Sequence, residues 1–183
     1  MKNIELLDSD KKQIQEWLLS ILIGIAIALI IFSIFTSYVV KGSSMFPTFK
    51  QDERVYVNKL SKITNNYKTK DIIVFHEDKK NDYIKRVIGT PNDKVEYKQD
   101  TLYVNGKQID EPYLSSNREN KFTEYLTEDF SVKDIKGAKG QMTIPKDKYL
   151  VLGDNRENSK DSRSEEVGLI DKKQIVGKVI TKR

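Results

Sequence analysis

The stretch 42–48, Gly-Ser-Ser-Met-Phe-Pro-Thr, places small hydroxyl groups between residues that constrain the backbone. Gly42 permits unusual backbone angles and Pro47 fixes its own φ, so the stretch can hold the Ser44 side chain in one place. The Ser44 hydroxyl could act as a nucleophile, but a serine is a weak nucleophile and needs a base. Because Gly, Ser and Pro also dominate ordinary turns, these seven residues alone favour a simple connector.

Two side chains could supply that base. His76 is the only histidine, so a Ser/His/Asp triad would have to use it, but its position between an apolar run and charged residues is typical of a structural strand end. Lys85 lies among apolar neighbours and would share a strand face with Tyr83 and Val87. Burial would lower the pKa of Lys85 from about 10.4 toward neutrality and allow it to act as a general base. The alternative is an edge-strand lysine whose amine reaches water.

A third polar cluster, residues 153–163, follows the apolar run 149–152. The end of a strand is a common place for a site. Ser159 could hydrogen-bond a neutral lysine amine, and Asp161 and Arg163 could form a bidentate ion pair that fixes the loop. The alternative is an ordinary turn rich in Asp and Asn.

The residues before the first cluster must hold it at a defined place, and they are strongly apolar. Residues 17–40 contain no Asp, Glu, Lys, Arg or His, and as a helix they would span roughly 36 Å, enough to cross a bilayer core of about 30 Å. Their length argues against a buried core helix, and the triplet 37–39 does not fit a signal-peptide cleavage site. We therefore expect a polar segment over 1–16 and a retained transmembrane helix over 17–40. The lysines on its two sides are nearly balanced in number, so charge leaves the orientation open.

Residues 41–183 are expected to form one domain of many short strands, with an Asn-Gly hairpin turn at 105–106. The polar stretch 111–145 is expected to be an inserted loop or a small β subdomain. The predicted fold class is thus mainly β: a single N-terminal transmembrane helix followed by an antiparallel β-sheet domain with a small polar insertion. The predicted strands cover residues 54–57, 71–76, 83–88, 94–97, 101–104, 107–109, 149–152 and 174–180.

The composition of the chain limits the classes of partner that it could bind. The formal net charge is +5, which suits an anionic membrane surface, whereas no recognition motif or basic helix points to nucleic acid. With no cysteine and a single histidine, Cys-based zinc sites and two-His metal sites are excluded.

Taken together, these segments resemble bacterial type I signal peptidases in their short Gram-positive form, which are membrane-anchored serine proteases that remove signal peptides from exported proteins. The resemblance covers nearly the whole chain and rests on the apolar segment and on residues 42–48, 83–93 and 153–163. It implies that Ser44 is the nucleophile and Lys85 its general base. It also implies that preproteins bearing signal peptides are the substrates, and that no metal or cofactor is needed.

The resemblance assigns supporting roles as well. Ser159 would orient the Lys85 amine, and the stretch 111–145 would belong to the variable, non-catalytic region. The N-terminus would be cytoplasmic and the catalytic domain would lie on the outer face of the cell membrane. The residues implied to hold the scaffold of the site are Arg86, Asp154, Asp161 and Arg163.

Two positions depart from the family's pattern. Some relatives carry a serine two positions before the nucleophile that helps to bind the oxyanion, but Gly42 stands there in this chain, as is usual in Gram-positive relatives. The oxyanion would then rely on the Ser44 N–H, with the Gly42 backbone or a water as candidate second donor and the part of Ser43 open. Asn92 replaces the usual glycine before Asp93, and asparagine tolerates a positive φ.

The expected substrate pocket accepts small residues, as in an Ala-X-Ala site, and its walls are expected to be Val40, Met45 and Ile84. A substrate would bind as an extended strand along the segment that ends at Lys85. Two other functions remain to be weighed: a tethered β-domain that binds exported chains without cutting, and a self-cleaving repressor that also uses a Ser/Lys pair. An intact Ser44 and Lys85 argue against the first, and the apolar anchor argues against the second.

Overall fold

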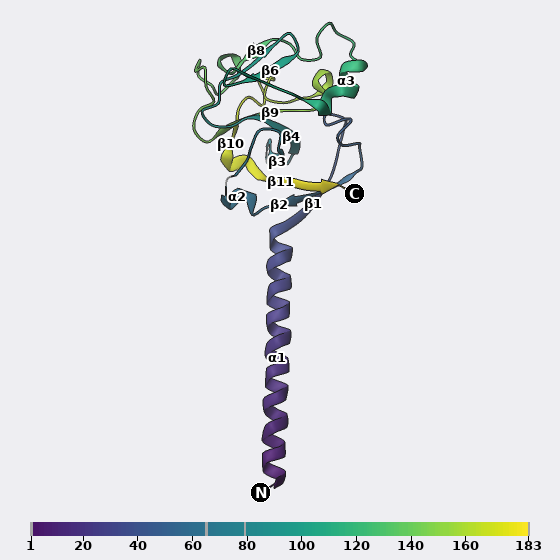
Figure 1. Ribbon diagram of the computed structural model, residues 1–183, viewed down its shortest axis with the longest axis vertical. Coiled ribbons are helices and arrows are strands. Elements are labelled where there is room, and N and C mark those ends of the chain that lie inside the picture. The colour runs from purple at the N-terminus through teal and green to yellow at the C-terminus, as the bar shows by residue number, and fades with distance from the viewer. Residues whose placement is uncertain (1, 65, 79, 183) are drawn as a thin grey trace. The chain divides into compact units, whose positions relative to one another are not determined.

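The computed structural model describes residues 2–64, 66–78 and 80–182, and it divides into two compact units, Met1–Thr36 and Ser37–Arg183. The first unit is dominated by the helix α1 (Lys2–Ile34), drawn in purple in Figure 1. Its segment Gln13–Ile34 has a mean hydropathy of 2.8 and is not buried, so by length and composition it could cross a membrane.

The observed helix ends earlier than the predicted helix over 17–40. After Ile34 the chain becomes the strand β1 (Phe35–Val39), which neighbours β2 (Arg54–Asn58) in a sheet. Aromatic and β-branched residues favour strands, and β1 is built almost wholly from them. Beyond β1, Val40 N–H donates to Glu53 O at 2.8 Å, so backbone pairing continues past the strand.

The second unit contains a seven-stranded sheet in the order β1-β2-β11-β3-β4-β9-β10 (Figure 1). The pairings described from β2 to β10 are all antiparallel. β4 lies inside this sheet and pairs along both of its edges, with β3 on one side and β9 on the other. The remaining strands of this sheet are β3 (Ile72–His76), β4 (Asp82–Gly89), β9 (Lys148–Leu152), β10 (Ile170–Asp171) and β11 (Ile175–Lys182).

A smaller four-stranded sheet has the order β7-β6-β5-β8. Its β6–β7 hairpin turns at Asn105 and Gly106, which both have positive φ, as the Asn-Gly pair predicts. The stretch 111–145 adds short elements and no long helix. The elements here are β5 (Val95–Lys98), β6 (Thr101–Val104), β7 (Lys107–Ile109), β8 (Phe130–Ser131), the 3-10 helices η1 (Pro112–Leu114) and η2 (Val132–Asp134), and α3 (Ser115–Glu119).

Two further 3-10 helices and one short α-helix complete the second unit. They are α2 (Ser61–Thr64), η3 (Arg156–Asn158) and η4 (Lys172–Gln174). The predicted fold class is therefore confirmed: one N-terminal apolar helix and a mainly antiparallel β domain. All eight predicted strands are present.

Three buried hydrophobic clusters hold the second unit together. One of them lies beneath the stretch 42–48 and includes Val40, Met45 and Phe49 together with Val55 and Val57 of β2. Met45 is only 2% exposed, and burying a side chain of its size stabilises by about 1.5–3 kcal/mol. The residue next to Ser44 therefore fixes this loop to the sheet.

Candidate active site

Ser44 and Lys85 meet, although 41 residues separate them in the chain. The Lys85 Nζ atom lies 2.6 Å from Ser44 Oγ. Lys85 belongs to β4 and is 3% exposed, whereas Ser44 lies in the loop between β1 and β2 and is half-buried. The two groups predicted to be nucleophile and base are thus within hydrogen-bond reach.

The surroundings of Lys85 favour its neutral form. Burial lowers the pKa of Lys85 from 10.5 to about 8, although the carboxylates of Asp161 and Asp154 act to raise it. At pH 7 roughly one amine in ten would then be neutral. A neutral amine can accept a proton, so Lys85 can act as a base toward the Ser44 hydroxyl.

The position of Lys85 follows from the pattern of β4. Side chains alternate between the two faces of a strand, so Lys85 shares its face with Tyr83 and Val87, which pack in one buried cluster. The Lys85 amine lies 5.3 Å from the centre of the Tyr83 ring. In the register of the sheet, Lys85 is opposite Ile73 of β3, which is fully buried.

The loop after β9 holds the stretch that carries Ser44. Asn155 N–H donates to Ser44 O at 3.0 Å, and the Asn155 side chain donates to Ser43 O at 3.2 Å. Gly153 packs closely against Ser44 and Ser159. A Cβ atom at Gly153 would lie 2.5 Å from Ser44 O and 2.1 Å from Ser159 Oγ. No side chain larger than hydrogen fits at Gly153 without a displacement.

Asp154 joins three segments at the centre of the site. It is fully buried and accepts two hydrogen bonds from Arg86, at 2.8 Å from Nε and 2.6 Å from Nη2. The Thr48 hydroxyl also donates to this carboxylate. Arg86 donates further to Lys70 O at 2.9 Å and stacks 3.7 Å from the centre of the Tyr113 ring. Arg86 and Asp154, two of the residues implied to hold the scaffold of the site, thus contact each other directly.

Asp161 and Arg163 form the predicted bidentate pair, with both Arg163 Nε and Nη2 2.9 Å from the Asp161 carboxylate. The Gly153 N–H donates to the same carboxylate at 2.9 Å. Burial by itself raises the pKa of Asp161, but the hydrogen bonds and charge of Arg163 and the Gly153 N–H outweigh burial and hold the pKa below 3.8. Asp161 is therefore a fixed negative charge near Lys85.

Ser159 does not make the predicted contact. Its Oγ is buried and forms no hydrogen bond with the Lys85 amine. The Lys85 amine is directed to Ser44 Oγ, and the Ser159 side chain packs instead against Gly153. The orienting role of Ser159 toward the Lys85 amine therefore stays a prediction.

A cleft of about 570 Å³ opens at Ser44 and Lys85. Its walls come from residues 38–45 on one side and 80–85 on the other, and Asn158 and Lys160 complete it. The cleft therefore runs between the end of β1 and the start of β4. The residues predicted for the oxyanion site and the substrate pocket all line it: Gly42 for the former, and Val40, Met45 and Ile84 for the latter.

Comparison with known proteins shows the family to which the chain belongs. A family model described as signal peptidase, peptidase S26, matches residues 14–182. The chain belongs to the signal peptidase family. Signal peptidase IB of Staphylococcus aureus (strain COL) is 54% identical over 92% of this chain and 88% of its own length, and signal peptidase I S of Bacillus subtilis (strain 168) is 45% identical over the same shares.

A solved structure gives the same result. The crystal structure of a signal peptidase I from Enterococcus faecalis V583 aligns with a TM-score of 0.55 at 39% identity, and covers 62% of this chain and 96% of that chain. The chain is accordingly a signal peptidase I, a serine peptidase and therefore a hydrolase that acts on preproteins.

Sequence reasoning missed a buried polar cluster that supports the site of this signal peptidase. Glu111 is 2% exposed and pairs with the buried Arg156, whose Nη2 lies 2.7 Å from Glu111 Oε1. Tyr97 and Tyr113 donate their hydroxyls to the same carboxylate. Arg156 also donates through Nε to Gly153 O at 3.0 Å. The stretch 111–145 was expected to lie outside the catalytic region, but through Glu111 it contacts the loop that packs on Ser44.

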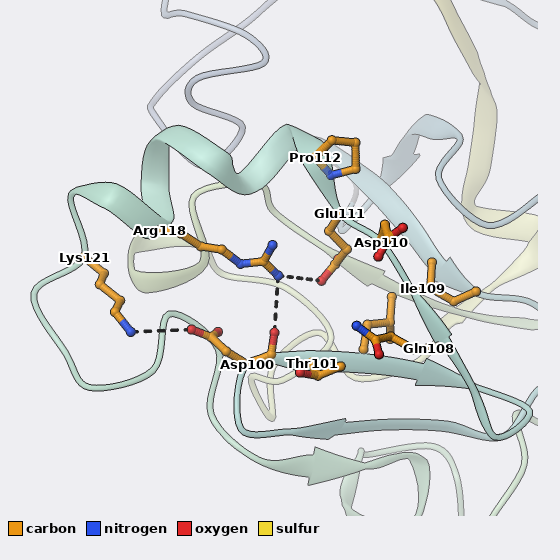
Figure 2. Close-up of a pocket in the computed structure, with 10 residues that line it drawn as sticks. Asp100, Thr101, Gln108, Ile109, Asp110, Glu111, Pro112, Arg118 and Lys121 are labelled. Carbon is orange, nitrogen blue, oxygen red and sulfur yellow. Dashed lines mark hydrogen bonds and ion pairs between the residues drawn. The ribbon is translucent and has the colours of Figure 1, made fainter.

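A second pocket of this signal peptidase, of about 610 Å³, lies beside the small sheet (Figure 2). Four of its five charged residues contact one another: Arg118 donates to Asp100 O at 3.2 Å and lies 3.7 Å from Glu111, and Lys121 lies 3.7 Å from Asp100. None of its lining residues is a serine. The cleft at Ser44 is therefore the better candidate for the active site, although it is slightly smaller.

Proposed function

We propose that this signal peptidase I cuts preproteins through a Ser44/Lys85 dyad and an acyl-enzyme. The observation that carries the proposal is the 2.6 Å contact between Lys85 Nζ and Ser44 Oγ inside a buried site. Neutral Lys85 takes the Ser44 proton while Ser44 attacks the scissile carbonyl carbon. The protonated amine then donates to the leaving amine, and Lys85 activates water to release the acyl group.

The oxyanion of the tetrahedral intermediate is expected to bind the Ser44 N–H. Donors that are held in place before the reaction are worth about 3–4 kcal/mol each, so a rigid loop matters here. Two hydrogen bonds from Asn155 and the buried Met45 side chain support that rigidity. Arg86, Asp154, Asp161 and Arg163 act as the scaffold of the site and not as groups that touch the substrate.

The substrate is proposed to lie as an extended strand in the cleft between residues 38–43 and 80–85. Val40 and Met45 are almost wholly buried and form a shallow apolar floor, and Ile84 is half-buried beside Lys85. A shallow floor accepts alanine better than a large side chain. Cutting after Ala-X-Ala is the specificity that these walls support.

The apolar part of α1 is proposed to anchor the enzyme in the cell membrane, with the N-terminus cytoplasmic and the β domain on the outer face. Its length and hydropathy support a single crossing of the phospholipid bilayer. An anchored enzyme and a membrane-bound preprotein share one surface, which raises their effective concentration.

The test is cleavage of a precursor peptide with one Ala-X-Ala site by the full chain in lipid vesicles, read by intact mass. Wild type should give a single cut after the second alanine, and Ser44→Ala should give none. Ser131→Ala is the matched control, because among the described residues the hydroxyl of Ser131, in the small sheet, bonds only Asp134. Cutting by Ser44→Ala at the wild-type rate would refute the mechanism, and no cutting by folded wild type would favour a domain that binds without cutting.

A further inference from the structure

One side chain from the polar stretch 111–145 joins two loops of the site. Asn117, in α3, donates from Nδ2 to Phe46 O at 2.9 Å and to Asp154 O at 2.8 Å. The side-chain amide has two N–H groups, so both are used. The two acceptors lie 71 and 37 residues away in the chain.

Both acceptors belong to segments that place the proposed dyad. Phe46 follows Ser44 by two residues, and Asp154 holds Arg86, the neighbour of Lys85 on β4. The bond from Asn155 N–H to Ser44 O joins the same two loops from within. Asn117 joins them from a third element, so its amide limits how far the Ser44 loop can move from the loop after β9.

The helix α3, which carries Asn117, is held in place by its neighbouring residues. Leu114, just before α3, is fully buried. Arg118, the next residue after Asn117, donates to Asp100 O at 3.2 Å and lies 3.7 Å from the buried carboxylate of Glu111, as Figure 2 shows. An amide held in this way is a fixed contact and not a mobile surface group.

We propose that Asn117 is a positioning residue that keeps Ser44 in register with Lys85. This proposal rests on the proposed function of the Ser44/Lys85 dyad. Asn117 is not among the residues that line the cleft, so it acts on the chemical step and not on substrate binding. Its loss should therefore lower kcat and leave KM nearly unchanged.

Two substitutions test this role. Asn117→Asp keeps the shape but replaces both donors by a carboxylate that faces two carbonyl oxygens. Asn117→Ala removes the contact without adding a charge. Displacing reacting groups by about 1 Å can cost about 100-fold in rate, so we expect kcat to fall about 10- to 100-fold in both variants.

Asn120 offers a matched control. It follows α3 and is exposed, and within the part of the chain that the structure describes its side chain donates only to Ser116 O, at 2.7 Å. Asn120→Asp and Asn120→Ala make the same chemical changes three residues away without touching either loop of the site. Both should keep kcat within about twofold of wild type, since surface changes away from such contacts have small effects.

The experiment measures kcat and KM of full-length wild type and the four variants in lipid vesicles, at a temperature where melting curves show each protein folded. A fall in kcat with KM within about twofold, confined to the Asn117 variants, supports the positioning role. A kcat near wild type in Asn117→Ala, an equal fall in the Asn120 variants, or a change confined to KM would overturn it. If neither Asn117 variant folds, the residue serves the fold at large and the proposal is also overturned.

The same measurements separate this proposal from the proposed function. An inactive, folded wild type, or an active Ser44→Ala variant, refutes the dyad and with it the role of Asn117. An active wild type and an inactive Ser44→Ala variant with a normal Asn117→Ala variant refute the positioning role alone.

Discussion

Replacing Lys85 by methionine should make the folded protein more stable at neutral pH while it abolishes cutting. A lysine in the unfolded chain has a pKa of 10.5, whereas burial lowers the pKa of Lys85 in the folded protein to about 8. At pH 7 this difference costs about 3 kcal/mol of folding free energy. Methionine has a similar length and no charge, so Lys85→Met removes that cost. Losing the hydrogen bond to Ser44 destabilises the variant by about 1 kcal/mol, so its free energy of unfolding should exceed that of wild type by about 2 kcal/mol.

The extra stability of Lys85→Met over wild type should depend on pH. Between pH 8 and 10.5 the unfolded chain binds a proton at Lys85 that the folded protein does not, so the stability of wild type rises with pH through this window. The stability cost of Lys85 should shrink from about 3 kcal/mol at pH 7 to about 1 kcal/mol at pH 9.5. The advantage of Lys85→Met over wild type should shrink by the same amount. Other titrating groups are common to both proteins and cancel in the difference.

The assay is reversible denaturation of the full chain in detergent micelles at pH 7, 8 and 9.5, with wild type and Lys85→Met in parallel. Lys94→Met is the control, because the Lys94 side chain is 42% exposed and, among the described residues, its amine pairs only with Glu96. A Lys85→Met protein that is less stable than wild type at pH 7, or a gain that is the same at all three pH values, would refute the argument that Lys85 is buried at the expense of its charge.

Further predictions concern rate and packing. The kcat/KM of wild type should rise about tenfold per pH unit below the pKa of Lys85 and level off above about pH 8. His76→Ala should show the same profile, and a loss of activity in this variant would instead identify His76 as the base. Gly153→Ala should lower kcat about 10- to 100-fold, because its Cβ would displace Ser44 O, whereas Gly24→Ala, which meets open space, should retain wild-type kinetics in the same peptide assay. Asp154→Asn should destabilise the protein by about 3–5 kcal/mol in thermal melts, because it leaves Arg86 without its charged, buried partner. Glu96→Gln should cost less than about 1 kcal/mol, because both lysines that pair with Glu96 reach solvent, and equal losses in the two variants would contradict this expectation.

Much of the fold could be predicted because alternation and turn residues are local signals. The pattern of β4 and the Asn-Gly turn before β7 are examples, and both are confirmed. The strand β1 was missed because Phe35–Val39 continues the uncharged run 17–40, so only its pairing in the sheet reveals it. The strands β8 and β10 have two residues each, too few for a periodic pattern.

The site was predictable to the extent that its residues form compact motifs. Ser44, Lys85 and the loop after β9 each lie in a recognisable run, and the structure brings them together. Glu111 and Asn117 could not be found in this way, because each is one polar residue in a polar stretch. Their contacts depend on how the small sheet packs against the rest of the domain, and no local pattern records that packing.

The adjacency of Lys85 and Arg86 on β4 limits how this chain can vary in length. The two residues point to opposite faces of one strand, and each contacts a different partner: Ser44 for Lys85 and the buried Asp154 for Arg86. Inserting or deleting one residue ahead of them within β4 would exchange the two faces and break both contacts at once. Insertions and deletions that related chains retain should therefore fall in the turns that precede and follow β4, and the length of β4 itself should stay constant.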